Sequence, residues 1–153
     1  MFNVVIGCVI VAFTTYLGYA VSKKYYFKRK FYQSFYDFNL IMKSEIAFGR
    51  NTVKSIIEKN DDGGEFYKKI KRYVENEKYE RVDYFAESDN DFVLNYYKTI
   101  GEGDAVSQTK FVDGADGRLK KYLEEACLNE KKYRTLYLKL GFMVGLIIMI
   151  IIL

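Results

Sequence analysis

The stretch that most resembles a chemical motif is IGEGDAVSQTKF, residues 100–111, in which glycines alternate with acids. A phosphate-binding loop needs the pattern G-x-G-x-x-G after a strand, or a lysine after the second glycine. Neither is present, and Glu102 and Asp104 would repel an anion held by backbone amides. We therefore expect a corner, where Gly101 or Gly103 stops one helix in the left-handed conformation and Asp104 accepts amide hydrogen bonds at the start of the next.

Other side chains that could do chemistry are few. Histidine is absent, and Cys8 and Cys127 lie far apart, so the sequence contains no metal or redox pair of cysteines. Glu45, Glu102 and Asp104 are the acids worth considering, and none has an evident base, nucleophile or metal partner. The sequence predicts no catalytic, cofactor-binding or metal site, hence a protein that is not an enzyme. A membrane-bound enzyme is the alternative, which loss of turnover on Asp104→Asn would support.

The elements that position these residues begin with an uncharged segment. Every charged side chain lies between Lys23 and Lys139. Residues 1–22 would form a helix of about 33 Å, enough for a hydrocarbon core of about 30 Å. A cleaved signal peptide is the alternative, but the segment has no basic start, which favours a retained anchor. We expect a transmembrane helix over residues 2–22.

A second apolar segment ends the chain. Residues 140–153 would form only about 21 Å of helix, which is short for a bilayer. Adding residues 135–139 gives about 28 Å, provided that Lys139 extends its ammonium group back to the headgroups. The alternative is a helix buried in a soluble core, but this segment has no polar face and the chain is too small to surround it. We expect a second transmembrane helix over residues 135–153.

Basic residues cluster on the inner side of both segments. The clusters are Lys23, Lys24, Lys28, Arg29 and Lys30, and Lys131, Lys132, Arg134 and Lys139. Because basic residues near membrane ends prefer the cytoplasm, we expect a two-pass protein of the cell membrane, with both termini outside and residues 23–139 as a cytoplasmic domain. Lipid or nucleic-acid binding is the alternative explanation. Acids interrupt the basic residues throughout the domain, so we expect no nucleic-acid partner.

The cytoplasmic part has helical periodicity. One apolar stripe recurs every three or four residues: Phe27, Phe31, Phe35, Phe38, Met42 and Ile46. Tyr25, Tyr32 and Tyr36 fall on a neighbouring face, where we expect them half-exposed. We expect Gly49 to end this helix. Further helices are expected from Asn51 or Thr52, across Phe66 to Val74, and from an Asp89 cap to Ile100, whereas residues 77–88 permit no assignment. The predicted fold class is all-α, a helical bundle between two transmembrane helices.

The last helix carries a heptad pattern. Its a and d positions are Ala105, Gln108, Val112, Ala115, Leu119, Tyr122, Ala126, Asn129, Tyr133, Leu136 and Leu140. The polar Gln108 and Asn129 could fix the register. Packing inside the domain is favoured over an intermolecular coiled coil, because many seam residues are small.

Two stretches resemble elements of a known family. GEGDAVSQ, which enters the long helix, is similar to the L-G-x-S-D-x-x-x-Q element of the stage III sporulation protein AB family. LIMKSEIAFGRNTVKSIIEK, residues 40–59, resembles the family's other helix pair, and the two terminal anchors also fit. The chain departs from the family pattern at Ile100, where Leu is usual, at Gly103, where Ser is usual, and at Val53, which lacks the neighbouring proline of a T-P-L turn.

The resemblance implies a function. It implies a non-enzymatic membrane platform or scaffold, made in the mother cell and required for the stage III A channel to the forespore. The family's helical domain is similar to the inner-membrane platform protein of type II secretion. Implied partners are the stage III sporulation ATPase, the AA protein, and other stage III A proteins. A membrane-anchored adapter of a type II secretion-like system unrelated to sporulation is the alternative.

The resemblance also selects candidate interaction residues. They are Gly101, Gly103, Asp104 and Gln108 in the turn, and Glu45, Ile46 and Phe48 in the helix pair.

Overall fold

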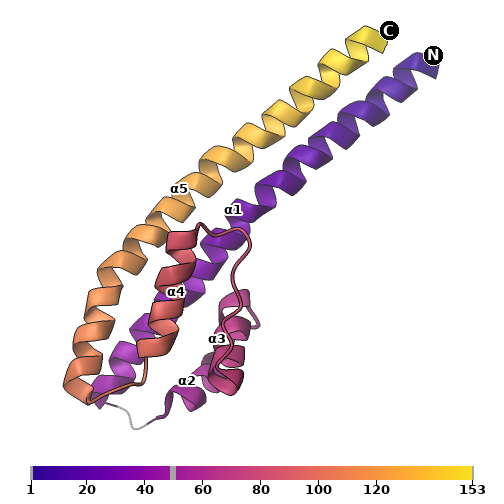
Figure 1. The fold of residues 1–153 in the computed structure, drawn as a ribbon. Helices are drawn as coiled ribbons and strands as arrows, with labels where there is room; N and C mark the ends of the chain where they lie inside the picture. Colours follow the sequence, from indigo (N-terminus) through magenta and orange to yellow (C-terminus); the bar gives the residue numbers. More distant parts are fainter. Residues whose placement is uncertain (1, 49–50, 153) are drawn as a thin grey trace. The chain divides into compact units, whose positions relative to one another are not determined.

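The computed structural model of the chain describes residues 2–48 and 51–152, which form helices joined by short loops and contain no strand (Figure 1). The helices are α1 (Phe2–Phe48), α2 (Val53–Asn60), α3 (Glu65–Asn76), α4 (Glu87–Thr99) and α5 (Ala105–Ile152). This confirms the predicted all-α class. The predicted helix stop at Gly49 lies outside the described residues.

Two compact units make up the chain. The ends of α1 and α5 form one, Met1–Arg29 with Glu125–Leu153, which we call the paired-helix unit. Lys30–Glu124 forms the other, which we call the body. The borders of the predicted cytoplasmic domain, residues 23 and 139, refer to a membrane and stay predictions.

Within the paired-helix unit, α1 and α5 run antiparallel and touch through glycines (Figure 1). A Cβ atom added to Gly141 would lie 2.5 Å from the carbonyl oxygen of Thr14, and one added to Gly18 would collide with the carbonyl oxygen of Tyr137. Apolar helices gain no hydrophobic driving force from each other in lipid, so small residues that let backbones approach closely are the usual basis of their packing. Backbone contact therefore holds this pair.

The register of the pair is regular along the whole unit. Facing residues are Gly7 with Met149, Gly18 with Tyr137, Tyr25 with Tyr133 and Arg29 with Glu130. Residues 4–22 of α1 consequently lie opposite residues 135–152 of α5. The two apolar segments have nearly equal length, because the stretch 135–139 completes the shorter one.

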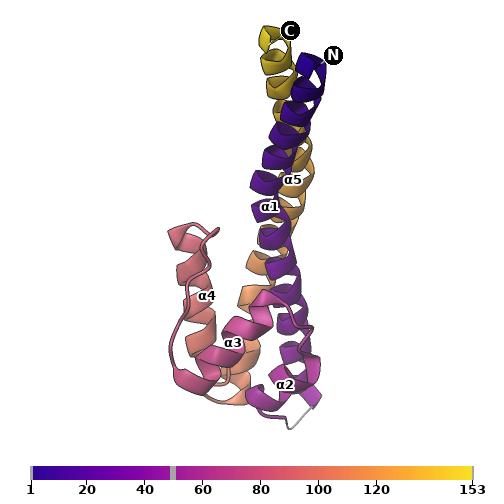
Figure 2. The same ribbon diagram turned by 90° about the vertical axis from the view of Figure 1, so that its right-hand side faces the viewer.

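The body has an aromatic core. Phe66 of α3 lies at its centre, with its ring 5.5 Å from that of Phe31, 4.8 Å from that of Phe35 and 5.4 Å from that of Phe38. Tyr96 of α4 packs edge-on against Phe35 at 4.6 Å. Figure 2 shows α3 crossing the α1 segment of the body. The predicted α1 stripe is confirmed from Phe31 to Met42, whereas Phe27 is exposed.

Two details of the body correct the sequence-based expectations. Tyr32 is fully buried instead of half-exposed, since its ring stacks between Phe85 at 5.0 Å and Tyr122 at 5.3 Å. Helix α4 begins at Glu87, with Ala86 in the capping position, so Asp89 lies inside the first turn and does not cap it. The loop before α4 accounts for the first difference, because it places Phe85 in the core against Tyr32.

The heptad expected along α5 holds in the middle of the helix, whereas its first position, Ala105, is exposed. Gln108, Val112, Ala115, Leu119 and Ala126 are buried as predicted.

Further along α5, the heptad prediction is wrong at Asn129, which is exposed, and at two leucines. Leu136 and Leu140 are 42% and 46% exposed, and the contacts to α1 come from Tyr137, Gly141 and Gly145. These contacts recur every four residues, because close glycine packing, and not a seam of large apolar side chains, sets the pairing in this unit.

Candidate functional site

The turn between α4 and α5 contains two left-handed glycines. Gly101 has φ +84° and Gly103 has φ +87°, values that side chains with a Cβ rarely adopt. The Asp104 carboxylate then accepts a hydrogen bond from the Ser107 amide at 2.8 Å, in the manner of a helix N-cap. These hydrogen bonds from the Ser107 hydroxyl and backbone amide hold the pKa of Asp104 below its ordinary value. The stretch is a corner between helices.

The buried side chain of Gln108 closes this corner. Its Oε1 accepts a hydrogen bond from the Gly101 amide at 2.9 Å, while its Nε2 donates to the carbonyl of Thr99 at 3.0 Å and to that of Glu102. One amide group thereby pairs with three backbone groups at and after the end of α4. Gln108 connects the last turn of α4 to the first turn of α5.

The two stretches singled out in the sequence meet at this corner. A Cβ atom on Gly101 would lie 2.6 Å from Cγ2 of Val53, at the start of α2. Gly101 is thus constrained twice, by its left-handed backbone and by the packing of Val53. The Thr52 hydroxyl caps α2 by accepting a hydrogen bond from the Ser55 amide at 3.3 Å.

The predicted helix-pair residues lie at the end of α1, and they differ in exposure. The Glu45 carboxylate accepts a hydrogen bond from the Asn51 side chain at 2.9 Å, and Ile46 is half-buried. Phe48 is 92% exposed, and Val106 at the start of α5 is also exposed. In Figures 1 and 2 the end of α1, the start of α2 and the start of α5 lie at the same end of the body. This end therefore presents apolar side chains to solvent.

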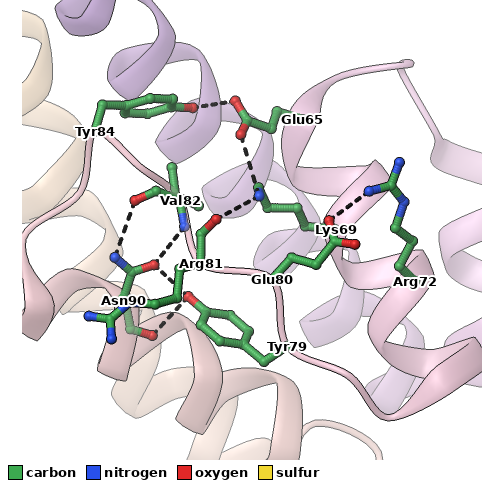
Figure 3. Close-up of polar contacts among 9 residues, drawn as sticks. All are labelled: Glu65, Lys69, Arg72, Tyr79, Glu80, Arg81, Val82, Tyr84 and Asn90. Atoms are coloured by element: carbon green, nitrogen blue, oxygen red, sulfur yellow. Dashed lines mark hydrogen bonds and ion pairs between the residues drawn. The ribbon is translucent and has the colours of Figure 1, made fainter.

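A buried asparagine organises the loop that the sequence left unassigned (Figure 3). Oδ1 of Asn90 accepts hydrogen bonds from the Val82 amide and the Tyr79 hydroxyl, each at 2.8 Å, and its Nδ2 donates to the Val82 carbonyl at 3.2 Å. Val82 and Phe85 are thereby held in the core. A polar residue on the apolar face of α4 was the one sequence signal that could have indicated this contact.

Side chains of α3 hold the same loop from the other side (Figure 3). The Tyr84 hydroxyl donates to Glu65 at 2.5 Å, and the Lys69 ammonium donates to the Arg81 carbonyl at 2.8 Å. Arg72 forms an ion pair with Glu80 at 2.6 Å. Residues 77–86 are consequently an ordered structural element of the body, although they contain no helix or strand.

The buried tyrosines of the body contribute to its packing and hydrogen bonding. Burial raises the pKa of Tyr79 to about 12 and also raises the pKa values of Tyr96 and Tyr97, so these phenols stay neutral near pH 7. The Tyr96 hydroxyl donates to the buried Asn39 amide oxygen at 2.9 Å, and the amide nitrogen of Asn39 donates to the Val112 carbonyl. Within the described residues, no group of three potential ligands could hold a metal ion.

The family of the chain follows from its sequence. Residues 3–153 match the family model described as stage III sporulation protein AB. The chain belongs to the stage III sporulation protein AB family. No curated protein and no solved structure matches it.

Membership in the AB family identifies the chain as a sporulation protein. Both α1 and α5 are long and apolar enough to cross a membrane, which supports a membrane protein. In this AB family protein the turn and the helix pair form one corner of the body.

Proposed function

We propose that this protein is a non-enzymatic membrane platform of the stage III A channel that joins the mother cell to the forespore. In this proposal the paired-helix unit crosses the mother-cell membrane, with both termini outside. The body lies in the cytoplasm and docks the stage III sporulation ATPase, the AA protein, together with other stage III A proteins. The observation that carries the proposal is the register of the paired helices.

The register supports a two-pass arrangement. Because residues 4–22 lie opposite residues 135–152, a membrane that holds the first segment also holds the second. Lys139 then lies near the level of Tyr16, so its side chain must extend toward the end of the segment for the ammonium to reach the headgroups. Tyr25, Tyr133 and Tyr137 stack at the same end, where aromatic rings are favoured between lipid and water.

A cysteine-labelling experiment in membranes tests the topology. Cys8→Ser and Cys127→Ser remove the native thiols, after which single cysteines are added before Met1, after Leu153 and at the exposed Lys78. In intact cells a membrane-impermeant maleimide is expected to label the two added termini and not Lys78→Cys. Labelling of Lys78→Cys together with either terminus would refute the arrangement.

The apolar end of the body is the surface that we propose for the ATPase. Phe48 offers an almost fully exposed ring, and aromatic side chains are frequent hot spots in protein interfaces. A hot spot contributes 2 kcal/mol or more, so its truncation weakens binding by about thirtyfold or more. The corner built by Gly101 and Gln108 would hold this surface in a fixed shape.

Affinity measurements with the full-length protein in detergent and the purified ATPase test this surface. Phe48→Ala is expected to leave the melting temperature unchanged and to weaken ATPase binding by about thirtyfold. Val74→Ala is the control, because Val74 is also an exposed apolar residue of the body but lies on α3. Equal binding by Phe48→Ala and the wild-type protein would exclude this surface.

A further inference from the structure

The paired-helix unit contains a cleft at its charged end. The cleft has a volume of about 130 Å³ and is lined by Tyr19, Ser22, Lys23, Tyr26, Phe27 and Arg134. It combines two cationic side chains with aromatic rings. Ser22 is buried and donates its hydroxyl to the Tyr19 carbonyl at 2.7 Å, so it contributes packing to the wall of the cleft.

The positive charge of the cleft is incompletely balanced. Glu130 is the only acid among residues 23–29 and 130–139, where eight residues are basic. Its carboxylate pairs with Arg29 at 2.5 Å, whereas the Arg134 guanidinium is 3.8 Å away. A charge-assisted hydrogen bond is usually about 2.7–2.9 Å, so Arg29 takes most of the charge of Glu130. The Lys23 ammonium lies 5.2 Å from the ring centre of Tyr19, a contact that leaves its charge in place.

The position of the two cations matches the depth of lipid headgroups. Lys23 is the first charged residue after the apolar segment of α1, and Arg134 directly precedes residues 135–152 of α5. The ring of Phe27 is 45% exposed beside them. The cleft thus offers cations and an apolar surface together, which suits an amphiphile better than a free anion.

We propose that this cleft binds the phosphodiester group of an anionic phospholipid, held between the Lys23 ammonium and the Arg134 guanidinium. The rings of Tyr19, Tyr26 and Phe27 contact the glycerol and upper acyl region. Basic pockets between membrane helices on the cytoplasmic side are known to suit such headgroups. This inference rests on the proposed crossing of the membrane by α1 and α5.

General attraction between basic residues and a negative membrane surface would not produce selective lipid binding at this cleft. That attraction depends on the number of charges and affects every cation at this depth alike. Lys24 and Lys132 provide the comparison, since each is exposed and lies over a tyrosine ring, at 5.1 Å from Tyr25 and 5.4 Å from Tyr133. They match the cleft cations in charge and match Lys23 in its ring contact, but they do not line the cleft.

The test uses full-length protein in vesicles of equal parts phosphatidylglycerol and phosphatidylcholine. Native mass spectrometry after gentle extraction measures the ratio of the two lipids retained per protein. The wild-type protein is expected to prefer phosphatidylglycerol. Lys23→Ala with Arg134→Ala should reduce that preference about tenfold more than Lys24→Ala with Lys132→Ala, because charge-assisted hydrogen bonds each contribute about tenfold or more.

Three outcomes would overturn the inference. The first is that the wild-type protein shows no preference for phosphatidylglycerol. The second is that the two double alanine variants lose the same amount of this preference. The third is that inorganic phosphate at equal concentration displaces the lipid, which would assign the cleft to a free anion. Lys23→Arg with Arg134→Lys keeps both charges and is expected to retain more of the preference than the double alanine variant. Retention equal to that of the double alanine variant would argue against charge recognition.

Thiol labelling in intact cells separates this inference from the proposed function. A failed topology with both termini inside would refute the platform arrangement. A correct topology without lipid preference would remove only the lipid site.

Discussion

The two units of this protein hold their helices together by opposite means. In the paired-helix unit, Gly18 and Gly141 bring backbones into contact, whereas in the body large rings such as Phe66 and Tyr96 fill the space between helices. Burial of aromatic surface stabilises a protein in water, but lipid gives apolar side chains little reason to leave it. The packing of each unit therefore indicates the solvent in which that unit folds.

The largest effect is expected at the centre of the body. Phe66→Ala should reduce the free energy of unfolding by about 3–5 kcal/mol, because a large cavity remains among rigid rings. Chemical denaturation of the full-length protein in detergent, followed by near-ultraviolet circular dichroism, measures this loss. The exposed Val74 on the same helix is the control, and Val74→Ala should change stability by about 0.5 kcal/mol or less. A loss below about 1 kcal/mol for Phe66→Ala would mean that the rings can repack.

Loss of the Asn90 amide should have the next largest effect. Asn90→Ala leaves the Val82 amide without its acceptor and is expected to cost about 2–3 kcal/mol. Hydrogen exchange of the Val82 and Tyr79 region should accelerate at the same time. The exposed Asn95 on the same helix provides a matched variant, Asn95→Ala, for which neither change is expected. Similar exchange rates in both variants would contradict the role of Asn90.

Substitution of glycine by alanine should have opposite effects on stability in the two units. At Gly141 an added methyl group meets the Thr14 carbonyl, so Gly141→Ala should lose about 1–3 kcal/mol. Gly114 lies in a helix of the body with no atom within 4 Å of an added Cβ, so Gly114→Ala should gain about 1 kcal/mol. Melting temperatures in detergent compare the two variants directly. A gain at both positions would show that the paired helices are not in close contact.

The smallest effect concerns the Asp104 cap and depends on pH. Hydrogen bonds from Ser107 lower the pKa of Asp104 below its ordinary value of 3.8, so the folded state favours the carboxylate. That stabilisation is fully present above the unfolded pKa and is lost as the pH falls through the lowered folded pKa. Asp104→Ala should therefore reduce the melting temperature slightly at pH 6 and less at pH 3. Asp104→Asn keeps a capping acceptor and should remain closer to the wild-type protein at pH 6.

The sequence predicted those parts of the fold that depend on local periodicity. The stripe from Phe31 to Met42 follows the helical repeat, so α1 was predictable, and the Gly101 corner followed from turn chemistry. Residues 77–86 follow no repeat, since the distant Asn90 amide holds them. The burial of Tyr32 depends on Phe85 in that loop, so it could not be inferred from its own helix.

The candidate site was predictable only in part. The cap at Asp104 is a local contact, and the sequence indicated it. The contact between Gly101 and Val53 joins two separate stretches, and only the fold brings them together. The 92% exposure of Phe48 contradicts the usual burial of an apolar residue near a helical stripe, and periodicity alone gives no sign of it.

The matched register of α1 and α5 has a consequence for where such a protein can reside. Two apolar segments of nearly the same length at one level respond together to bilayer thickness, so a mismatch of a few ångströms affects both of them. Tilting one helix alone would separate Gly18 from Tyr137 and Gly141 from Thr14. The pair is therefore suited to one narrow range of hydrocarbon thickness, and lengthening either helix by a single turn should redistribute the protein between membranes of different thickness.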